Sequence, residues 1–107
     1  MAKNVVVFVS ASSFAEARKI AHGVVASKLA ACVSVIPSVE SIYWWKGKIE
    51  TGRELILVMK TTKPRVPALV RRVKLLHSYE VPEIIALPID AGNPDYLRWI
   101  GESVKGR

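Results

Sequence analysis

The stretch LHSYEVPEIIALP, residues 76–88, places His77, Tyr79 and Glu83 beside a run of apolar residues. An imidazole and a carboxylate are both ligands that proteins use for divalent metal ions. Two good donors do not complete a zinc or copper site, so a further ligand would have to come from elsewhere, such as another subunit. The sequence therefore predicts at most a weak or shared metal site at His77 and Glu83.

Each of these residues also has a structural interpretation. His77 ends an apolar stripe, where a histidine is more often a core or interface residue with a satisfied hydrogen bond. Glu83 could pair with Lys60 or an arginine instead of binding a ligand. Cys32, the single cysteine, has apolar neighbours and is expected to pack as a small hydrophobe. No nucleophile with a base and no phosphate-binding loop is recognisable, so we expect no enzyme.

Hydrophobic periodicity indicates the elements that position these side chains. The order is strand, helix, two strands, helix, strand and a closing helix, which predicts an α+β fold of the ferredoxin-like βαββαβ type. Right-handed crossovers place both main helices on one sheet face. The expected elements are a central strand covered on both faces at 4–10, a helix at 14–29 with a capping box from Ser13 to Glu16, a hairpin at 31–61, a helix at 63–77, a buried strand at 82–89 and a helix capped by Asn93.

The hairpin contains two informative features. Pro37 cannot donate to a central ladder, so it marks an edge strand or a bulge where the hairpin bends. Beyond it, residues 39–54 form an arm too long for one small domain to cover, and the arm concentrates Tyr43, Trp44 and Trp45. An exposed aromatic arm of this kind favours an interface with a partner.

Length and composition limit the function classes. A chain of 107 residues with half of them apolar predicts one domain over residues 1–107. Its 16 Lys and Arg against 9 Asp and Glu give a net charge of +7, but they are scattered along the sequence, and the RRVK group suits a solvated helix face. We therefore expect no nucleic-acid partner and, without a membrane-spanning run, no membrane partner. One cysteine and no signal sequence favour the cytoplasm.

Five motifs carry a family resemblance, in this order and spacing: SKLAACVSVIP, SIYWWKGKIE, VMKTTK, LHSYEVPEIIALPI and GNPDYLRWI. The chain closely resembles the CutA family of divalent-cation tolerance proteins from end to end. The resemblance implies a homotrimer whose hairpins embrace neighbouring subunits, with an architecture similar to the PII signalling proteins. The implied partner of Tyr43, Trp44 and Trp45 is thus another copy of the chain.

The resemblance also implies binding of copper and other divalent cations. Some members use a cysteine at the end of the first strand and two adjacent histidines at the end of the second helix. Those positions carried over are Val9 and Leu76, which cannot coordinate, and His77. A cleft between subunits would retain His77, Tyr79 and Glu83 near Lys60, and hold a cation such as copper weakly. The alternatives are a PII-like sensor that binds an anionic metabolite through Lys60 and nearby arginines, and a minor hydrolase that depends on His77 or Glu83.

Overall fold

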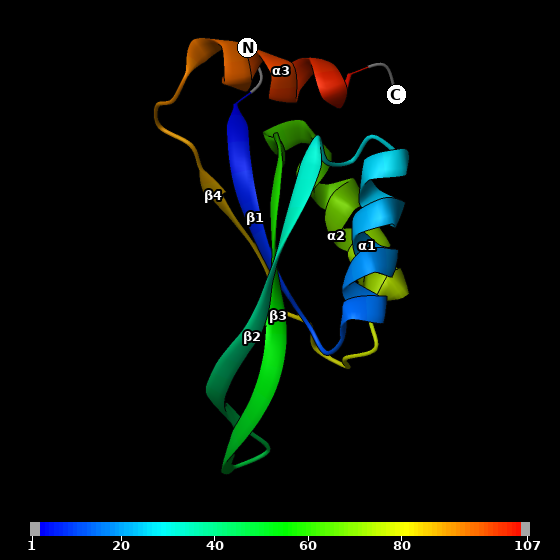
Figure 1. Cartoon of the computed structure of the whole chain (residues 1–107), viewed down its shortest axis with the longest axis vertical. Coiled ribbons are helices and arrows are strands. Elements are labelled where there is room, and N and C mark those ends of the chain that lie inside the picture. The colour runs from blue at the N-terminus through cyan, green and yellow to red at the C-terminus, as the bar shows by residue number, and fades with distance from the viewer. Residues whose placement is uncertain (1–2, 106–107) are drawn as a thin grey trace.

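A four-stranded antiparallel sheet organises the chain, with two helices on one face and a third helix at one end (Figure 1). The computed structural model describes residues 3–105. The sheet order is β2-β3-β1-β4, which confirms the ferredoxin-like α+β fold. The elements are β1 Asn4–Ala11, α1 Phe14–Ala26, β2 Cys32–Trp45, β3 Lys48–Thr62, a 3-10 turn Lys63–Arg65, α2 Val66–Leu76, β4 Ile84–Pro88 and α3 Pro94–Ser103.

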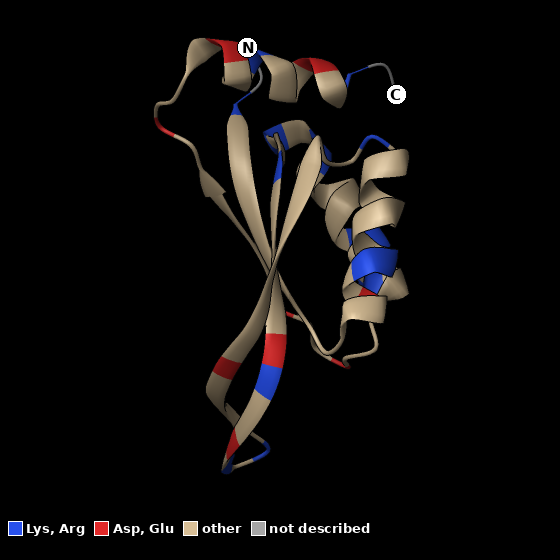
Figure 2. Ribbon diagram, viewed as in Figure 1, with Lys and Arg blue, Asp and Glu red and all other residues tan. Residues whose placement is uncertain are grey.

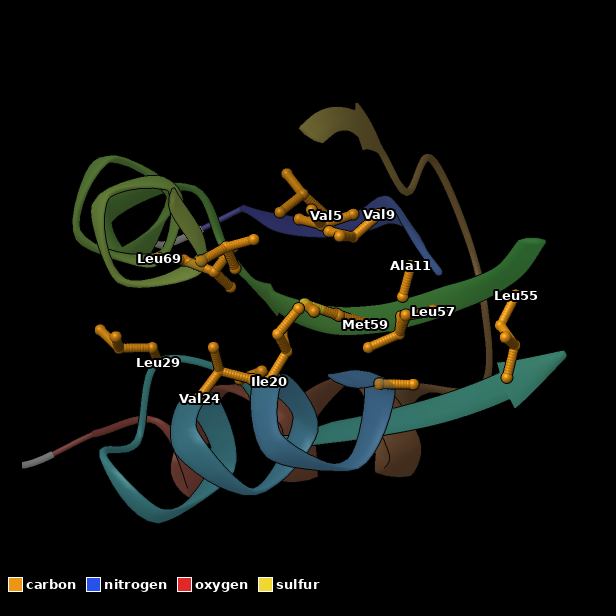
Figure 3. Close-up of a cluster of buried hydrophobic side chains, with 14 residues drawn as sticks. Val5, Val9, Ala11, Ile20, Val24, Leu29, Leu55, Leu57, Met59 and Leu69 are labelled. Atoms are coloured by element: carbon orange, nitrogen blue, oxygen red, sulfur yellow. The ribbon is translucent and has the colours of Figure 1, made fainter. Parts of the chain in front are cut away.

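The main core lies between the sheet and the two helices α1 and α2 (Figure 3). Period-two alternation directs every second residue of β1 and β3 toward the helices, as Val7 and Leu57 illustrate. Leu69 of α2 meets them, and all three are fully buried. The residues of α1 that complete this layer recur at helical spacing and include Ala17, Ile20 and Val24.

The prediction that the first strand is covered on both faces was wrong. β1 is central, between β3 and β4, but Val6 and Phe8 on its other face are only half-buried. Both crossover helices lie on one side of the sheet, and on the opposite face α3 contacts β1 and β3 without burying these two side chains. A continuous apolar run therefore marks a central strand here without marking a second covered face.

The last strand also differs from its prediction. Residues 82–89 were expected to form a buried strand, but β4 spans only Ile84–Pro88 and lies at the sheet edge. It pairs with β1 alone, and Ile85 remains 51% exposed. The helices are shorter than expected as well, since α1 ends at Ala26 and α2 ends at Leu76, so that His77 has an extended backbone.

The long hairpin extends past the helical layer as a two-stranded arm (Figure 1). Its register shifts between Ile36 and Val39, and Ser38 between them adopts a left-handed φ of 59°. The expected irregularity at Pro37 on an edge strand is thus confirmed. At the tip, Lys46 and Gly47 both have positive φ, as a tight two-residue hairpin turn requires.

The carboxylate of Glu16 joins the start of α1 to the end of α2. Ser13 caps α1 by accepting a hydrogen bond from the Glu16 amide at 3.1 Å, as predicted. The reciprocal bond of the capping box is made with Ser12 instead, whose N–H and hydroxyl both donate to Oε1. Oε2 accepts from the Ser78 amide at 2.6 Å, just beyond α2. One side chain therefore fixes two helix ends relative to each other.

These bonds shift the ionisation of Glu16. Burial by itself would raise the pKa, but the hydrogen bonds from Ser12 and Ser78 outweigh it and lower the pKa of Glu16 from 4.5 to about 2. Because the folded pKa lies below the unfolded one, the ionised carboxylate stabilises the fold above about pH 4.5. This stabilisation is lost as the pH falls toward about 2.

We predict that Glu16→Gln lowers the free energy of unfolding at neutral pH, and that its difference from the parent chain shrinks between about pH 4.5 and about pH 2. Urea unfolding at fixed protein concentration measures this difference. Glu102→Gln, which neutralises an exposed carboxylate on α3, is the matched control and should have little effect at any pH. A Glu16→Gln effect that stays constant through this pH range would contradict the assignment.

Candidate functional site

A pocket of about 870 Å³ opens where the arm meets the segment that follows α2. One wall is aromatic and consists of Tyr43, Trp44 and Trp45. The other side contributes Tyr79 and the carboxylates of Glu80 and Glu83, while a third carboxylate, that of Glu54, comes from β3. Within the described residues 3–105, no Lys or Arg lines the pocket. Its lining therefore favours cations over anions.

His77 lies behind this pocket with its side chain fully buried. Its Nε2 donates to the backbone carbonyl of Ser10 at 2.5 Å, and because a carbonyl only accepts, Nε2 carries the hydrogen. Nδ1 then has a lone pair and accepts a hydrogen bond from the Tyr79 amide at 3.0 Å. With both nitrogens engaged, the ring links the end of β1 to the pocket segment and has no free lone pair for a metal ion in this arrangement.

Tyr79 extends the link from His77 to the arm. Its ring packs against the imidazole with centroids 4.6 Å apart, and its hydroxyl donates to Oε2 of Glu54 at 2.7 Å. Burial, followed by this hydrogen bond and the charge of Glu54, raises the pKa of Tyr79 far above its ordinary value. The phenol therefore stays a neutral donor that ties the pocket segment to the base of the arm.

The predicted site residues divide into two groups. Tyr79 and Glu83 line the pocket together, and His77 holds Tyr79 from behind. Lys60 does not join them within the chain. It lies on β3, where it pairs with Val6 of β1, and it is six residues from Glu54, or roughly 20 Å along the strand. The expected proximity of Lys60 to this cluster concerns a cleft between subunits, and it therefore stays a prediction.

Sequence reasoning missed Glu54 and Glu80. Glu80 was available as the residue after Tyr79, but an exposed glutamate in a loop carries no signal of its own. Glu54 faces Val39 across the hairpin only because the bulge at Ser38 displaces the register. The size of that displacement is a property of the folded hairpin, so the pairing of Glu54 with Tyr79 was not readable from spacing.

The three carboxylates face a common space without forming a finished metal centre. Among the described residues 3–105, no group of three or more His, Cys, Asp or Glu side chains converges as metal ligands would. One carboxylate oxygen of Glu54 also accepts a hydrogen bond from Tyr79. Carboxylate oxygens suit hard divalent ions, while copper prefers nitrogen donors. The pocket can thus attract a divalent cation, and further donors are needed to hold one tightly.

Val9 and Leu76, at the two ligand positions that the sequence resemblance implied, lie in apolar surroundings. Val9 is fully buried in the core, and Leu76 approaches Gly23 of α1, where a Cβ added to the glycine would lie 2.8 Å from the leucine Cδ1. Both side chains serve helix and sheet packing.

Comparisons with known proteins are consistent along the whole chain. Residues 5–103 match the family described as CutA1 divalent ion tolerance protein. The divalent-cation tolerance protein CutA of Thermus thermophilus is 48% identical over 98 residues, which cover 92% of this chain and 95% of that protein. The rice protein CutA 1, chloroplastic, is 42% identical over 102 residues, or 95% of this chain and 58% of that protein. The chain thus spans little more than half of some relatives.

Solved structures agree with the sequence matches. The Thermus thermophilus Cut A1 structure superposes with a TM-score of 0.92 at 47% identity, covering 94% of this chain and 97% of that one. CutA1 from Oryza sativa gives a TM-score of 0.91 at 42% identity, with 94% of this chain and 93% of that chain covered. Sequence family, identity and fold coincide over nearly the whole chain, and the chain therefore belongs to the CutA1 divalent ion tolerance family.

Proposed function

We propose that the chain is a non-enzymatic protein of divalent-metal tolerance that binds divalent cations, copper included, weakly in the pocket between the arm and residues 78–83. The observation that carries this proposal is the lining, in which three carboxylates and no Lys or Arg meet within the described residues. The names of the relatives, which refer to divalent-cation tolerance, also support a role that involves divalent cations. A pocket of this charge concentrates cations before any ligand geometry is considered.

Glu83 is the proposed ligand from this segment, with Glu80 and Glu54 as neighbouring oxygen donors. His77 supports the site because its Nδ1 accepts a hydrogen bond from the Tyr79 amide. This nitrogen could coordinate a metal ion only if that hydrogen bond broke. An oxygen-rich set does not meet the preference of copper for nitrogen ligands. Weak binding is therefore expected from one chain, and a second subunit would have to supply further donors.

The alternative of a PII-like sensor for an anionic metabolite finds less support. An anion would need basic side chains, such as Lys60 and nearby arginines, and within one chain no Lys or Arg of the described residues lines the pocket. Three carboxylates would repel such a ligand by like-charge interaction. Cation binding is the better explanation of the same pocket.

Homotrimeric assembly is part of the proposal. The arm leaves Trp44 72% exposed, and Tyr43, Trp45 and Ile42 beside it are exposed as well. Contiguous apolar surface of this kind is typical of an interface. A second copy that covers the arm would also close the open side of the pocket, since the three aromatic residues line it. Because a single cysteine leaves no disulfide within the chain, we propose a cytoplasmic location.

The metal assignment predicts that Glu83→Gln weakens divalent-cation binding by about tenfold, equivalent to about 1.4 kcal/mol. Isothermal titration with copper and with manganese measures this change. Glu102→Gln removes the same charge from α3 and should leave the affinity unchanged. Equal affinities for the Glu83 variant and the parent chain would exclude Glu83 as a ligand.

The pH profile of the same titration separates the possible donors. A carboxylate site loses its cation as carboxylic acids take up protons, at about pH 4, and an imidazole site loses it at about pH 6.5. We expect the lower transition. A transition near the higher value that His77→Ala removes would show that the ring leaves Tyr79 to bind metal.

The assembly proposal predicts a native mass of three times the chain mass of 11.8 kDa. Trp44→Ser should shift the population toward smaller species, because it removes a large aromatic contact without disturbing the core of the chain. Leu75→Ser, on the outer face of α2, is the matched control for loss of an exposed apolar side chain. Monomers of the parent chain at micromolar concentration would overturn the proposal.

A further inference from the structure

The net charge of the chain resides in one layer of the fold. Residues 14–28 and 63–77, which contain α1 and α2, carry eight of the 16 Lys and Arg but one of the nine Asp and Glu. Their formal charge is therefore +7, which equals that of the whole chain, and the remaining residues carry eight charges of each sign. Figure 2 shows Lys and Arg on both helices, while acidic residues concentrate on the arm, the loops and α3.

Packing directs these charges outward. Ile20 of α1 and Val73 of α2 pack in the buried core against the sheet. The opposite faces of the two helices therefore form an outer surface of the chain. The cations on that surface are all exposed, and they are Arg18, Lys19, Arg71, Arg72 and Lys74. Glu16, the one acidic residue of the layer, has both oxygens engaged by Ser12 and Ser78. Its single negative charge offsets only one of the eight positive charges of the two segments, so the surface stays strongly basic.

Apolar side chains stand among the cations. Leu75 is 81% exposed and lines a shallow groove between the helices together with Lys19. Phe14, 48% exposed, lies under the guanidinium of Arg18, whose Cζ is 5.3 Å from the ring centroid. Neither side chain belongs to the aromatic arm or to the acidic pocket.

We propose that the outer face of α1 and α2 is a docking surface for an anionic lipid bilayer, to which the chain binds peripherally. Five exposed cations complement a negatively charged headgroup layer. Leu75 and Phe14 can enter the boundary between headgroups and acyl chains, as apolar residues of interfacial helices do. A nucleic-acid backbone offers the same negative charge but no apolar phase for these two side chains. The mixture therefore fits a membrane surface better.

This proposal revises the expectation that the chain has no membrane partner. That expectation rested on the lack of a spanning segment, and none of the helices within residues 3–105 is long and apolar enough to cross a bilayer. Peripheral binding needs no such helix, because charge and a few apolar side chains suffice. The surface is independent of the metal pocket, so either proposal can fail alone.

Sedimentation of the full chain with vesicles tests the proposal. We expect binding to vesicles of phosphatidylcholine and phosphatidylserine in equal parts and little binding to pure phosphatidylcholine. Binding should fall from about 0.1 M to about 1 M NaCl, as the Debye length shortens from about 10 Å to about 3 Å. The double variant Arg71→Gln/Arg72→Gln should bind about 25-fold more weakly, at about fivefold per cation. Leu75→Ser should lose roughly fivefold.

The double variant Lys48→Gln/Lys105→Gln is the matched control, because it removes two exposed positive charges outside the helical layer. It should retain most of the binding, and circular dichroism and native mass should match the parent chain for every variant. Absence of binding to the anionic vesicles at low salt would overturn the proposal. So would equal losses in the two double variants, or tighter binding to a short DNA duplex than to vesicles with no effect of Leu75→Ser on the vesicles.

Discussion

The buried imidazole of His77 is the contact on which the arrangement of the site depends. It accepts a hydrogen bond from the Tyr79 amide and donates one to the Ser10 carbonyl. The rigid ring therefore connects the end of β1 to the pocket segment. Glu16 reinforces this junction through Ser78. Tyr79 carries the constraint on to Glu54 at the base of the arm. Because an unpaired buried polar group is costly, the ring is expected to keep both partners, and the pocket then has a defined shape.

Charge is divided between two separate surfaces of the chain. The pocket at the arm collects Glu54, Glu80 and Glu83, whereas the helical layer holds the entire net positive charge. The two surfaces adjoin at Ser78, but none of the cations of the helical layer lines the pocket. A cation in the pocket and an anionic surface on the helices would therefore not compete for the same side chains. This separation allows a basic protein to offer an acidic site.

The fold leaves much apolar surface uncovered in a single chain. A sheet with both helices on one face exposes the other, where Phe8 is half-buried and Ile85 and Leu87 of β4 are exposed. The arm adds Trp44 beyond the body of the chain. Among residues 3–105, α3 contacts β1 and β3 but buries none of these side chains. The incompleteness is therefore built into the topology.

Local patterns in the sequence determined the order of the elements, the Ser13 and Asn93 caps and the irregularity at Pro37, because each depends on neighbours a few residues away. These patterns also predicted Tyr79 and Glu83 as site residues, although they did not predict Glu54. Only the tertiary structure decided which strand faces were covered, that Lys60 and Glu54 of one chain lie far apart on β3 and that half of the scattered cations share one layer. Periodicity reports that a side chain is apolar or polar, but its neighbours depend on crossover handedness, hairpin register and helix packing, which are properties of the whole chain.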